Sequence, residues 1–168
     1  MAVTGNHEYY WDVDLAVAAF RRIGVDVLLN EHRIVRHGDT TLVVVGIVDP
    51  MAIDACAAHL PDLDAALRWA PEGATRLLLA HRPRTASAAL ANGVDLQLSG
   101  HLHGGQCFPV SWLMRAFEPY VAGLYRIETL RLYVSRGTGY FNPPNRLGCP
   151  AEIAELTLRC GTDAVGHI

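Results

Sequence analysis

The residues best suited to chemistry are two histidines that one residue separates and glycines enclose. They are His101 and His103, within residues 99–106, and an apolar run at residues 94–98 precedes them. Such a run is typical of a short buried strand that ends in a turn. Neutral imidazole is the commonest metal ligand, and glycine lets the backbone approach a cation or a phosphate closely. The pattern predicts a metal or phosphate site, with a polar turn and two surface histidines as the alternative.

Two other stretches carry residues of a similar kind. Asn6, His7 and Glu8 follow a glycine at the start of the chain, and His81 follows a second apolar run at residues 77–80. Amide and imidazole groups are ligands for divalent transition metals. For Asn6 and Glu8 the alternative is simple turn chemistry, because asparagine is favoured where φ is positive.

The elements around the histidines are expected to bring two of them together. Residues 75–80 and 95–99 are typical of buried strands, and residues 85–92 between them predict an alanine-rich helix. A strand–helix–strand order implies a parallel pair. His81 and His101 then lie at the carboxyl ends of adjacent strands, where open α/β sheets bind their ligands. We predict that both histidines reach one common point.

The remaining pattern predicts an α/β domain. Helices are expected at residues 12–23, where Asp12 is the N-cap, and at residues 62–70. Strands are expected at residues 25–29, 41–48, 124–127, 130–135 and 152–158. Residues 108–122 are aromatic and interrupted by prolines, which predicts a loop packed on its own side chains. A substrate-facing lid and a membrane-touching loop are the alternatives for this segment.

The histidine-bearing stretches, in their order, resemble the last three motifs of the calcineurin-like metallophosphoesterases. These stretches are Gly-Asn-His-Glu at residues 5–8, the strand-end histidine, and Gly-His-Leu-His-Gly-Gly-Gln at residues 100–106. Residues 95–100, 123–125, 133–139 and 146–153 resemble the bacterial, often membrane-attached branch of phosphodiesterases. The resemblance runs from Val3 to Leu158.

The resemblance implies the C-terminal portion of an α/β sandwich, with mixed sheets flanked by helices. The earlier D-x-H and G-D-x-x-D motifs of the family do not occur in this sequence. We therefore expect a partial phosphoesterase domain over residues 1–160 and a tail over residues 161–168. The chain is expected to be a fragment, or to start downstream of the true start. With N-terminal strands missing, an apolar sheet edge or face is expected to stay open, which favours self-association.

The resemblance also implies a dinuclear metal site. One metal would be bound by Asn6, His81, His101 and a bridging aspartate from the absent motifs. The other would be bound by His103 together with an aspartate and a histidine of the absent D-x-H motif. Two divalent ions are expected in a complete domain, with Mn, Fe, Zn and Ni all suited to such ligands. In this chain we expect one ion or none.

The catalytic residues that the resemblance implies are His7 and Glu8. His7 matches a histidine that steadies the phosphoryl group and protonates the leaving oxygen, and Glu8 would orient that histidine or raise its pKa. The expected activity is hydrolysis of a small phosphoester, either a diester or a monoester. The alternatives are a non-catalytic truncated fragment and a mononuclear metal-binding module.

Composition limits the other possibilities. The 168 residues are 51% hydrophobic, which indicates a globular domain, and the net charge of −3 predicts no nucleic-acid partner. The four cysteines are scattered, which predicts reduced structural thiols. No run approaches the ~20 apolar residues of a membrane span, and no signal peptide is expected. We expect a cytoplasmic location, or membrane association of a full-length protein.

The other charged residues near these motifs are expected to have structural roles. Arg82 is predicted to pair with a carboxylate, and Arg136 and Arg146 to hold loops in place. Arg84 flanks the candidate site as a possible phosphate contact. The remaining histidines are predicted to be surface residues: His32, His37, His59 and His167.

Overall fold

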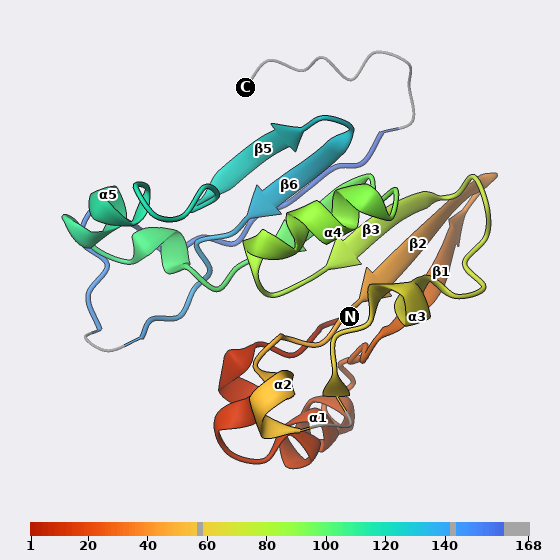
Figure 1. Cartoon of the computed structure of the whole chain (residues 1–168), viewed down its shortest axis with the longest axis horizontal. Helices are drawn as coiled ribbons and strands as arrows, with labels where there is room; N and C mark the ends of the chain where they lie inside the picture. The colour runs from red at the N-terminus through yellow and green to blue at the C-terminus, as the bar shows by residue number, and fades with distance from the viewer. Residues whose placement is uncertain (57–58, 142–143, 160–168) are drawn as a thin grey trace.

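The structure is a computed structural model that describes residues 1–56, 59–141 and 144–159 (Figure 1). Its centre is a six-stranded sheet with the order β1-β2-β3-β4-β6-β5. The strands β2, β3, β4 and β6 run parallel, and β1 and β5 pair antiparallel at the two edges. In chain order the strands are β1 (Glu31–His37), β2 (Thr40–Gly46), β3 (Thr75–Leu79), β4 (Leu96–Ser99), β5 (Gly123–Ile127) and β6 (Leu130–Val134). The predicted class, a mixed sheet flanked by helices, is confirmed.

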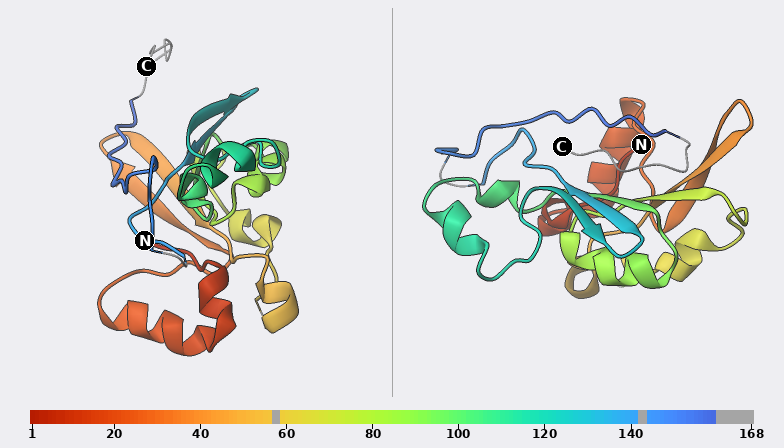
Figure 2. Two further views of the ribbon diagram at one scale, coloured as in Figure 1. Left: turned by 90° about the vertical axis from the view of Figure 1, so that its left-hand side faces the viewer. Right: turned by 90° about the horizontal axis from the view of Figure 1, so that it is seen from above.

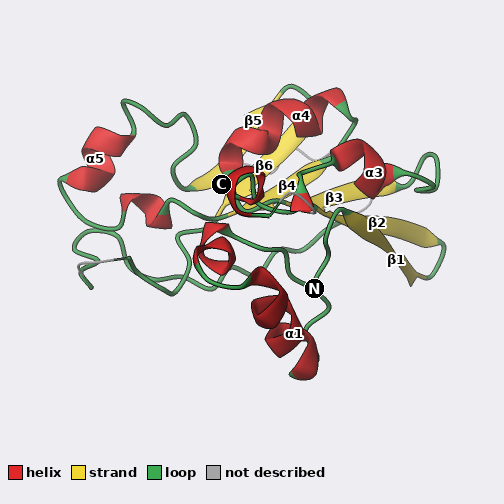
Figure 3. Cartoon of the chain, turned by 60° about the horizontal axis from the view of Figure 1, so that its bottom comes forward, coloured by secondary structure: helices red, strands yellow, loops and turns green. Residues whose placement is uncertain are grey.

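The helices are short and surround this sheet unevenly. Helices α3 and α4 cover one face of the sheet, and the C-terminal coil runs along the other side (Figure 2). Helix α1 lies to one side of the sheet, and α5 lies at one end of the molecule, beyond the strands (Figure 3). The α-helices are α1 (Val13–Arg22), α2 (Ala52–Ala55), α3 (Leu63–Leu67), α4 (Ala86–Ala91) and α5 (Val110–Met114). The 3₁₀ turns are η1 (Asn6–Tyr10), η3 (Pro83–Thr85) and η4 (His103–Gly105).

The main core lies between the sheet and helices α3 and α4. Side chains alternate across a strand, so Val43 and Val45 of β2 face the helices while Val44 faces the other way. Leu78 of β3 is fully buried against Ala89 of α4. Because this core is close-packed, truncating Leu78 to alanine is expected to cost about 2–5 kcal/mol.

The opposite face of the sheet is apolar but only partly covered by the described residues. Its fully buried member is Leu28. Around Leu28 lie leucines of three strands that stay half-buried: Leu42, Leu79, Leu96 and Leu98. An apolar, partly open face of this kind agrees with the expectation from the sequence.

Near the start of the sheet one prediction was wrong and one strand was missed. Residues 25–29 form no strand; a single parallel bridge joins Val27 to Ala2. The apolar character of this stretch reflects core burial, since Val27 and Leu28 are 1% and 0% exposed. Strand β1 was not predicted, because it is an exposed edge strand without alternating apolar residues. It forms a hairpin with β2 through Gly38, whose φ of +55° suits the turn.

Three further predictions need correction. Residues 152–158 are not a strand; they lie as an extended coil in which Glu152 binds Tyr133 and Arg136. The helix predicted at residues 62–70 ends at Leu67, because the backbone leaves the helical region at Arg68, with ψ of 126°, and Trp69 has a φ of +68°. Residues 108–122 contain helix α5, none of whose residues is buried, so this segment is not a loop packed on itself.

Other predictions on helices are confirmed. The carboxylate of Asp12 accepts a hydrogen bond from Leu15 N–H at 3.0 Å and caps α1. No helix in the described part of the chain is long and apolar enough to cross a membrane. The predicted tail at residues 161–168 lies outside the described residues.

Candidate metal centre

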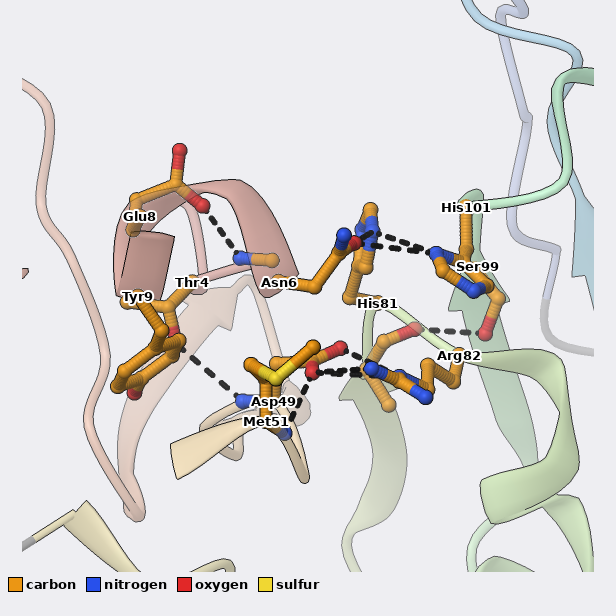
Figure 4. Close-up of polar contacts among 12 residues, drawn as sticks. Thr4, Asn6, Glu8, Tyr9, Asp49, Met51, His81, Arg82, Ser99 and His101 are labelled. Carbon is orange, nitrogen blue, oxygen red and sulfur yellow. Dashed lines mark hydrogen bonds and ion pairs between the residues drawn. The ribbon is translucent and has the colours of Figure 1, made fainter. Parts of the chain in front are cut away.

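The carboxyl ends of β3 and β4 bring His81 and His101 together. The parallel ladder continues beyond the strands, because Gly100 N–H donates to His81 C=O at 3.0 Å. The side chains converge, with His81 Nε2 lying 3.2 Å from His101 Nδ1 (Figure 4). Their ring planes meet at 69° with centroids 5.0 Å apart. The prediction that both histidines reach a common point is confirmed.

Asn6 completes this cluster from the other end of the sequence. Its Oδ1 lies 3.1 Å from His81 Nε2 and 3.2 Å from His101 Nδ1. The Asn6 amide nitrogen donates to the Tyr10 hydroxyl at 2.7 Å, which leaves the amide oxygen facing the histidines. Gly5 permits this approach, since a Cβ there would lie 3.0 Å from Cε1 and Nε2 of His81.

The spacing of these three donor atoms fits a single cation. Two ligands that each lie about 2.1 Å from one ion, at angles of about 90–110°, are about 3.0–3.4 Å apart. The measured separations are 3.1, 3.2 and 3.2 Å. The separations between the donor atoms of Asn6, His81 and His101 therefore lie within this range. No group of three or more His, Cys, Asp or Glu side chains in the described ranges is arranged to hold a metal ion.

Burial keeps the cluster histidines in the neutral form that binds metals. Burial and then the neighbouring His101 lower the pKa of His81 to about 4. The pKa of His101 is lowered by burial and by the nearby Arg82 guanidinium. His103 has a lowered pKa through burial and the charge of Arg146. Neutral imidazole has a lone pair on the ring nitrogen that carries no proton, and a cation binds to such a lone pair.

His103 lies near the cluster without joining it. Its Nδ1 is buried and has no hydrogen-bond partner among the described residues. Its ring meets Phe141 edge-on at a centroid distance of 5.9 Å. His101 and His103 both have positive φ, at +71° and +51°. In residues other than glycine, such backbone conformations cost about 1–3 kcal/mol each, and they concentrate at functional sites.

His7 and Glu8 have different places in the structure. His7 is exposed, and its ring lies 5.1 Å from that of Tyr10. Glu8 accepts a hydrogen bond from Gly5 N–H at 2.7 Å and so holds the η1 turn. No hydrogen bond joins Glu8 to His7 within the described residues, so the geometry matches the turn role that the sequence left open for Glu8.

A pocket of about 870 Å³ opens over the cluster. Its polar wall carries Asn6, His7, His81, His101 and His103, and its apolar wall is formed by Met114, Tyr140 and Phe141. The pocket therefore pairs a set of metal-binding groups with an apolar rim.

A buried polar network supports the histidines from below. Arg82 donates from Nε and Nη2 to the carboxylate of Asp49, at 3.0 Å in each case. Ser99 donates to Ala80 C=O at 2.7 Å and accepts from Gln97 at 2.9 Å, which ties β4 to the residue before His81. The predicted pairing of Arg82 with a carboxylate is confirmed. Asp49 and Ser99 were not predicted, although each ends an apolar run.

The loop that carries His103 is held by the late part of the chain. Cys149 Sγ contacts His103 C=O at 3.0 Å, and Arg146 donates to Arg136 C=O at 2.7 Å. Arg136 in turn donates to Glu152 at 2.6 Å. The predicted loop-holding roles of Arg136 and Arg146 are confirmed. Arg84 pairs with Glu118 at 3.0 Å.

Two of the other histidines are less exposed than predicted. His32 Nδ1 lies 2.8 Å from Ala66 C=O, and His59 Nδ1 lies 3.4 Å from the Tyr9 hydroxyl. His37 is exposed, as predicted. His167 lies outside the described residues.

Comparison with known proteins gives the same family as the motifs. The chain is 39% identical, over 94% of its length, to a protein of Bos taurus named transmembrane protein with metallophosphoesterase domain. It is 39% identical, over 93% of its length, to an uncharacterized metallophosphoesterase of Helicobacter pylori. The chain is homologous to the metallophosphoesterases. The predicted resemblance is thus confirmed, although no family model matches the chain.

These similarities concern part of each relative. The chain spans 38% of the length of the bovine protein and 41% of the Helicobacter pylori protein. Among solved structures, the sulfate thiohydrolase SoxB of Thermus thermophilus superposes with a TM-score of 0.53 at 22% identity. That match covers 79% of this chain and 27% of SoxB, and it shows that the two share a fold. Similarity to the metallophosphoesterases implies the use of divalent metal ions.

Proposed function

We propose that the protein takes part in metal-dependent hydrolysis of phosphoester bonds, and that Asn6, His81 and His101 bind one divalent cation. The observation that carries this proposal is the convergence of their donor atoms at 3.1–3.2 Å. The names of the relatives support the same chemistry. When bound, the cation activates water and offsets the charge of the phosphoryl oxygens.

The residues around the cluster supply the remaining functions. His7 stands exposed on the pocket wall, where it can steady a phosphoryl oxygen and give a proton to the leaving oxygen. His103 Nδ1, buried without a partner in the described chain, is the candidate ligand of a neighbouring second cation. Glu8 keeps the η1 turn closed and so fixes the position of His7. We propose Mn, Fe, Zn or Ni as the metal, since these suit nitrogen and oxygen ligands.

A second cation needs further carboxylates, because the described residues form no metal-holding group of three or more His, Cys, Asp or Glu side chains and the nearby Asp49 is paired with Arg82. Two divalent ions 4 Å apart repel each other by about 4 kcal/mol even in water, so an anion between them is required. The resemblance assigns that anion to the D-x-H and G-D-x-x-D motifs, which this sequence does not contain. We therefore propose that residues 1–160 are one part of a domain and bind one ion or none by themselves.

One observation favours a second candidate, a mononuclear metal-binding module. Three neutral donors meet at one point, while His103 lies apart from them. This arrangement suffices for one ion whose coordination shell is completed by water. The two candidates differ in stoichiometry and in activity once carboxylates are supplied.

The proposed partners are a small phosphoester and a membrane. The bovine relative is named a transmembrane protein, which supports membrane association of a longer chain. The partly covered sheet face around Leu28 is a candidate surface for self-association.

Metal titration tests the proposal. Manganese or zinc is titrated into the chain by calorimetry, and we expect at most one ion per chain. Asn6→Ala, His81→Ala and His101→Ala should each weaken binding by about 10-fold or more, a factor typical of losing groups that orient a metal. His37→Ala is the matched control, because this exposed histidine lies on β1, outside the cluster.

Hydrolysis of a bis(p-nitrophenyl) phosphate then separates the two candidates. The chain alone should be no faster than His101→Ala. A longer chain that supplies both absent motifs should be active and should lose activity in His7→Ala, His101→Ala and His103→Ala. Two tightly bound ions in the isolated chain would overturn the proposal, and an inactive longer chain that binds one ion would favour the module.

A further inference from the structure

Exposed apolar side chains gather around α5 at the end of the molecule. Phe108, Trp112 and Phe117 are 62%, 72% and 71% exposed, and Leu113 is 54% exposed. We call Phe108, Val110, Trp112, Leu113 and Phe117 the α5 surface. No residue of α5 is buried, and the helix lies at one end of the molecule, beyond the strands (Figure 1).

Neighbouring segments enlarge the α5 surface toward the pocket. Phe108 N–H donates to Leu147 C=O at 2.8 Å, and Leu147 is 64% exposed. Gln106 binds the backbone of Phe141 on both its N–H and its C=O, at 2.7 and 2.6 Å. Phe141 is 48% exposed and also lines the pocket above the histidines. Met114 of α5 lines the same pocket, so the α5 surface lies next to the rim of the candidate metal centre.

The helix is fixed to the metal-centre loop rather than hanging freely. Ser111 N–H donates to Cys107 C=O at 2.8 Å, close behind the η4 turn. A Cβ on Gly105 would lie 2.3 Å from Ser111 Cα, so the two segments are in direct contact. Because the α5 surface has a rigid base, its exposure is a built feature of the fold.

The charge around the α5 surface is opposite to that of the whole chain. Residues 101–117 contain no aspartate or glutamate, and Arg115 is exposed among the apolar side chains. The other arginines between residues 101 and 147 lie elsewhere, since Arg126 and Arg131 belong to the β5–β6 hairpin and Arg136 is paired with Glu152. Glu118 is already paired with Arg84 at 3.0 Å. The α5 surface thus carries one exposed positive charge, that of Arg115, and no carboxylate.

We propose that the α5 surface binds the face of an anionic lipid bilayer. Soluble surfaces rarely expose large contiguous apolar patches, and such patches mark interaction sites. Tryptophan, phenylalanine and leucine next to arginine suit the boundary between lipid head groups and acyl chains. Positive local charge then favours anionic over neutral lipids. This interaction needs no metal, so it stands or falls separately from the proposed hydrolysis.

The three tryptophans of the chain allow a direct test. Trp11 and Trp69 are 94% and 89% exposed, and neither belongs to the α5 surface. The double variant Trp11→Phe/Trp69→Phe keeps Trp112 as the only tryptophan, and Trp11→Phe/Trp112→Phe keeps Trp69. With vesicles of phosphatidylglycerol and phosphatidylcholine, emission of Trp112 should shift to shorter wavelength, and emission of Trp69 should not.

Vesicle sedimentation measures the same interaction without fluorescence. Arg115→Ala should weaken binding about fivefold, since one arginine near an anionic surface contributes about that factor. Trp112→Ser should abolish most binding, and Trp69→Ser should leave it unchanged. Phosphatidylcholine vesicles should bind at least about fivefold more weakly than the mixed vesicles. Circular dichroism should match that of the unmodified chain in all of these surface variants.

Three results would overturn the proposal. One is an unshifted Trp112 emission with anionic vesicles. Another is an equal shift of Trp69, which would indicate adsorption without use of the α5 surface. The third is a dimer in sedimentation equilibrium that Trp112→Ser dissociates and vesicles do not, which would assign the surface to a second copy of the chain.

Discussion

Arg82 and Asp49 form a bidentate ion pair directly beneath the candidate metal centre. Both bonds are 3.0 Å long, and the Asp49 side chain is fully buried. Asp49 also accepts from Met51 N–H, and its own N–H donates to Thr4 two residues before Asn6. The pair therefore links the segment that carries Asn6 to the residue that follows His81.

Asp49→Ala should destabilise the fold strongly. Removing the carboxylate leaves the Arg82 guanidinium, 30% exposed, without its partner, and we expect a loss of about 2–4 kcal/mol in the free energy of unfolding. Urea denaturation measures the change. Arg33→Ala is the control, because its pair with Asp26 is exposed on both sides and should contribute less than about 1 kcal/mol. Equal losses in the two variants would contradict the structural role of Asp49.

Gly5→Ala should weaken metal binding while leaving the fold stable. The φ of Gly5 is −103°, which any residue adopts, so the backbone tolerates the change. The new Cβ would lie 3.0 Å from the His81 ring and would push Nε2 away from Asn6 and His101. We expect a decrease in metal affinity of about 10-fold, measured by calorimetry, with little change in urea stability.

Gly139→Ala is the matched control for this prediction. A Cβ on Gly139 meets nothing within 4 Å and the residue has no positive φ, so metal affinity should stay the same. If Gly5→Ala bound metal as tightly as Gly139→Ala, the close contact with His81 would have no functional meaning.

Gly105→Ala should disrupt the loop between the histidines and α5. Gly105 has a φ of +82°, and a Cβ there would lie 2.3 Å from the backbone of Ser111. Gly38→Ala separates the cost of a positive φ from the cost of the steric contact. The φ of Gly38 is +55°, but a Cβ there meets nothing within 4 Å. We expect Gly38→Ala to cost about 1 kcal/mol and Gly105→Ala clearly more, both by urea denaturation. Similar costs would show that the contact with Ser111 relaxes freely.

The convergence of His81 and His101 was predictable because its geometry follows from topology. Two parallel strands joined by a helix place their carboxyl ends at the same sheet edge, whatever the details of packing. The position of Asn6 depended on family resemblance, since no local pattern shows where a turn at residue 6 meets residue 81. The structure supplies that contact through the bridge of Ala2 to Val27.

The parts that were not predictable depend on contacts that no local apolar pattern reveals. Strand β1 has four exposed residues in a row and forms through pairing with β2, not through an apolar pattern. Glu152 begins an alternating stretch, yet Tyr133 and Arg136 bind its carboxylate and no neighbouring strand pairs with it in the described ranges. Asp49 follows an apolar run and precedes a proline, which is equally typical of an ordinary turn.

The free energy of unfolding should depend on pH through His81. Burial, followed by the charge of His101, lowers the pKa of His81 from 6.5 to about 4 in the folded chain. The unfolded chain therefore binds more protons than the folded chain between these values, so the free energy of unfolding rises with pH. From pH 7 to pH 5 the loss attributable to His81 is about 2 kcal/mol. His101 and His103, whose pKa values are also lowered by burial, act in the same direction.

Urea denaturation at pH 5 and pH 7, with EDTA present to remove metal, measures this dependence. His81→Gln should reduce the rise in the free energy of unfolding between the two pH values, because glutamine does not titrate. His37→Gln, at an exposed position on β1, should leave the rise unchanged. A chain as stable at pH 5 as at pH 7, or a His81→Gln variant with the full dependence, would show that His81 is not held neutral by burial in the folded state.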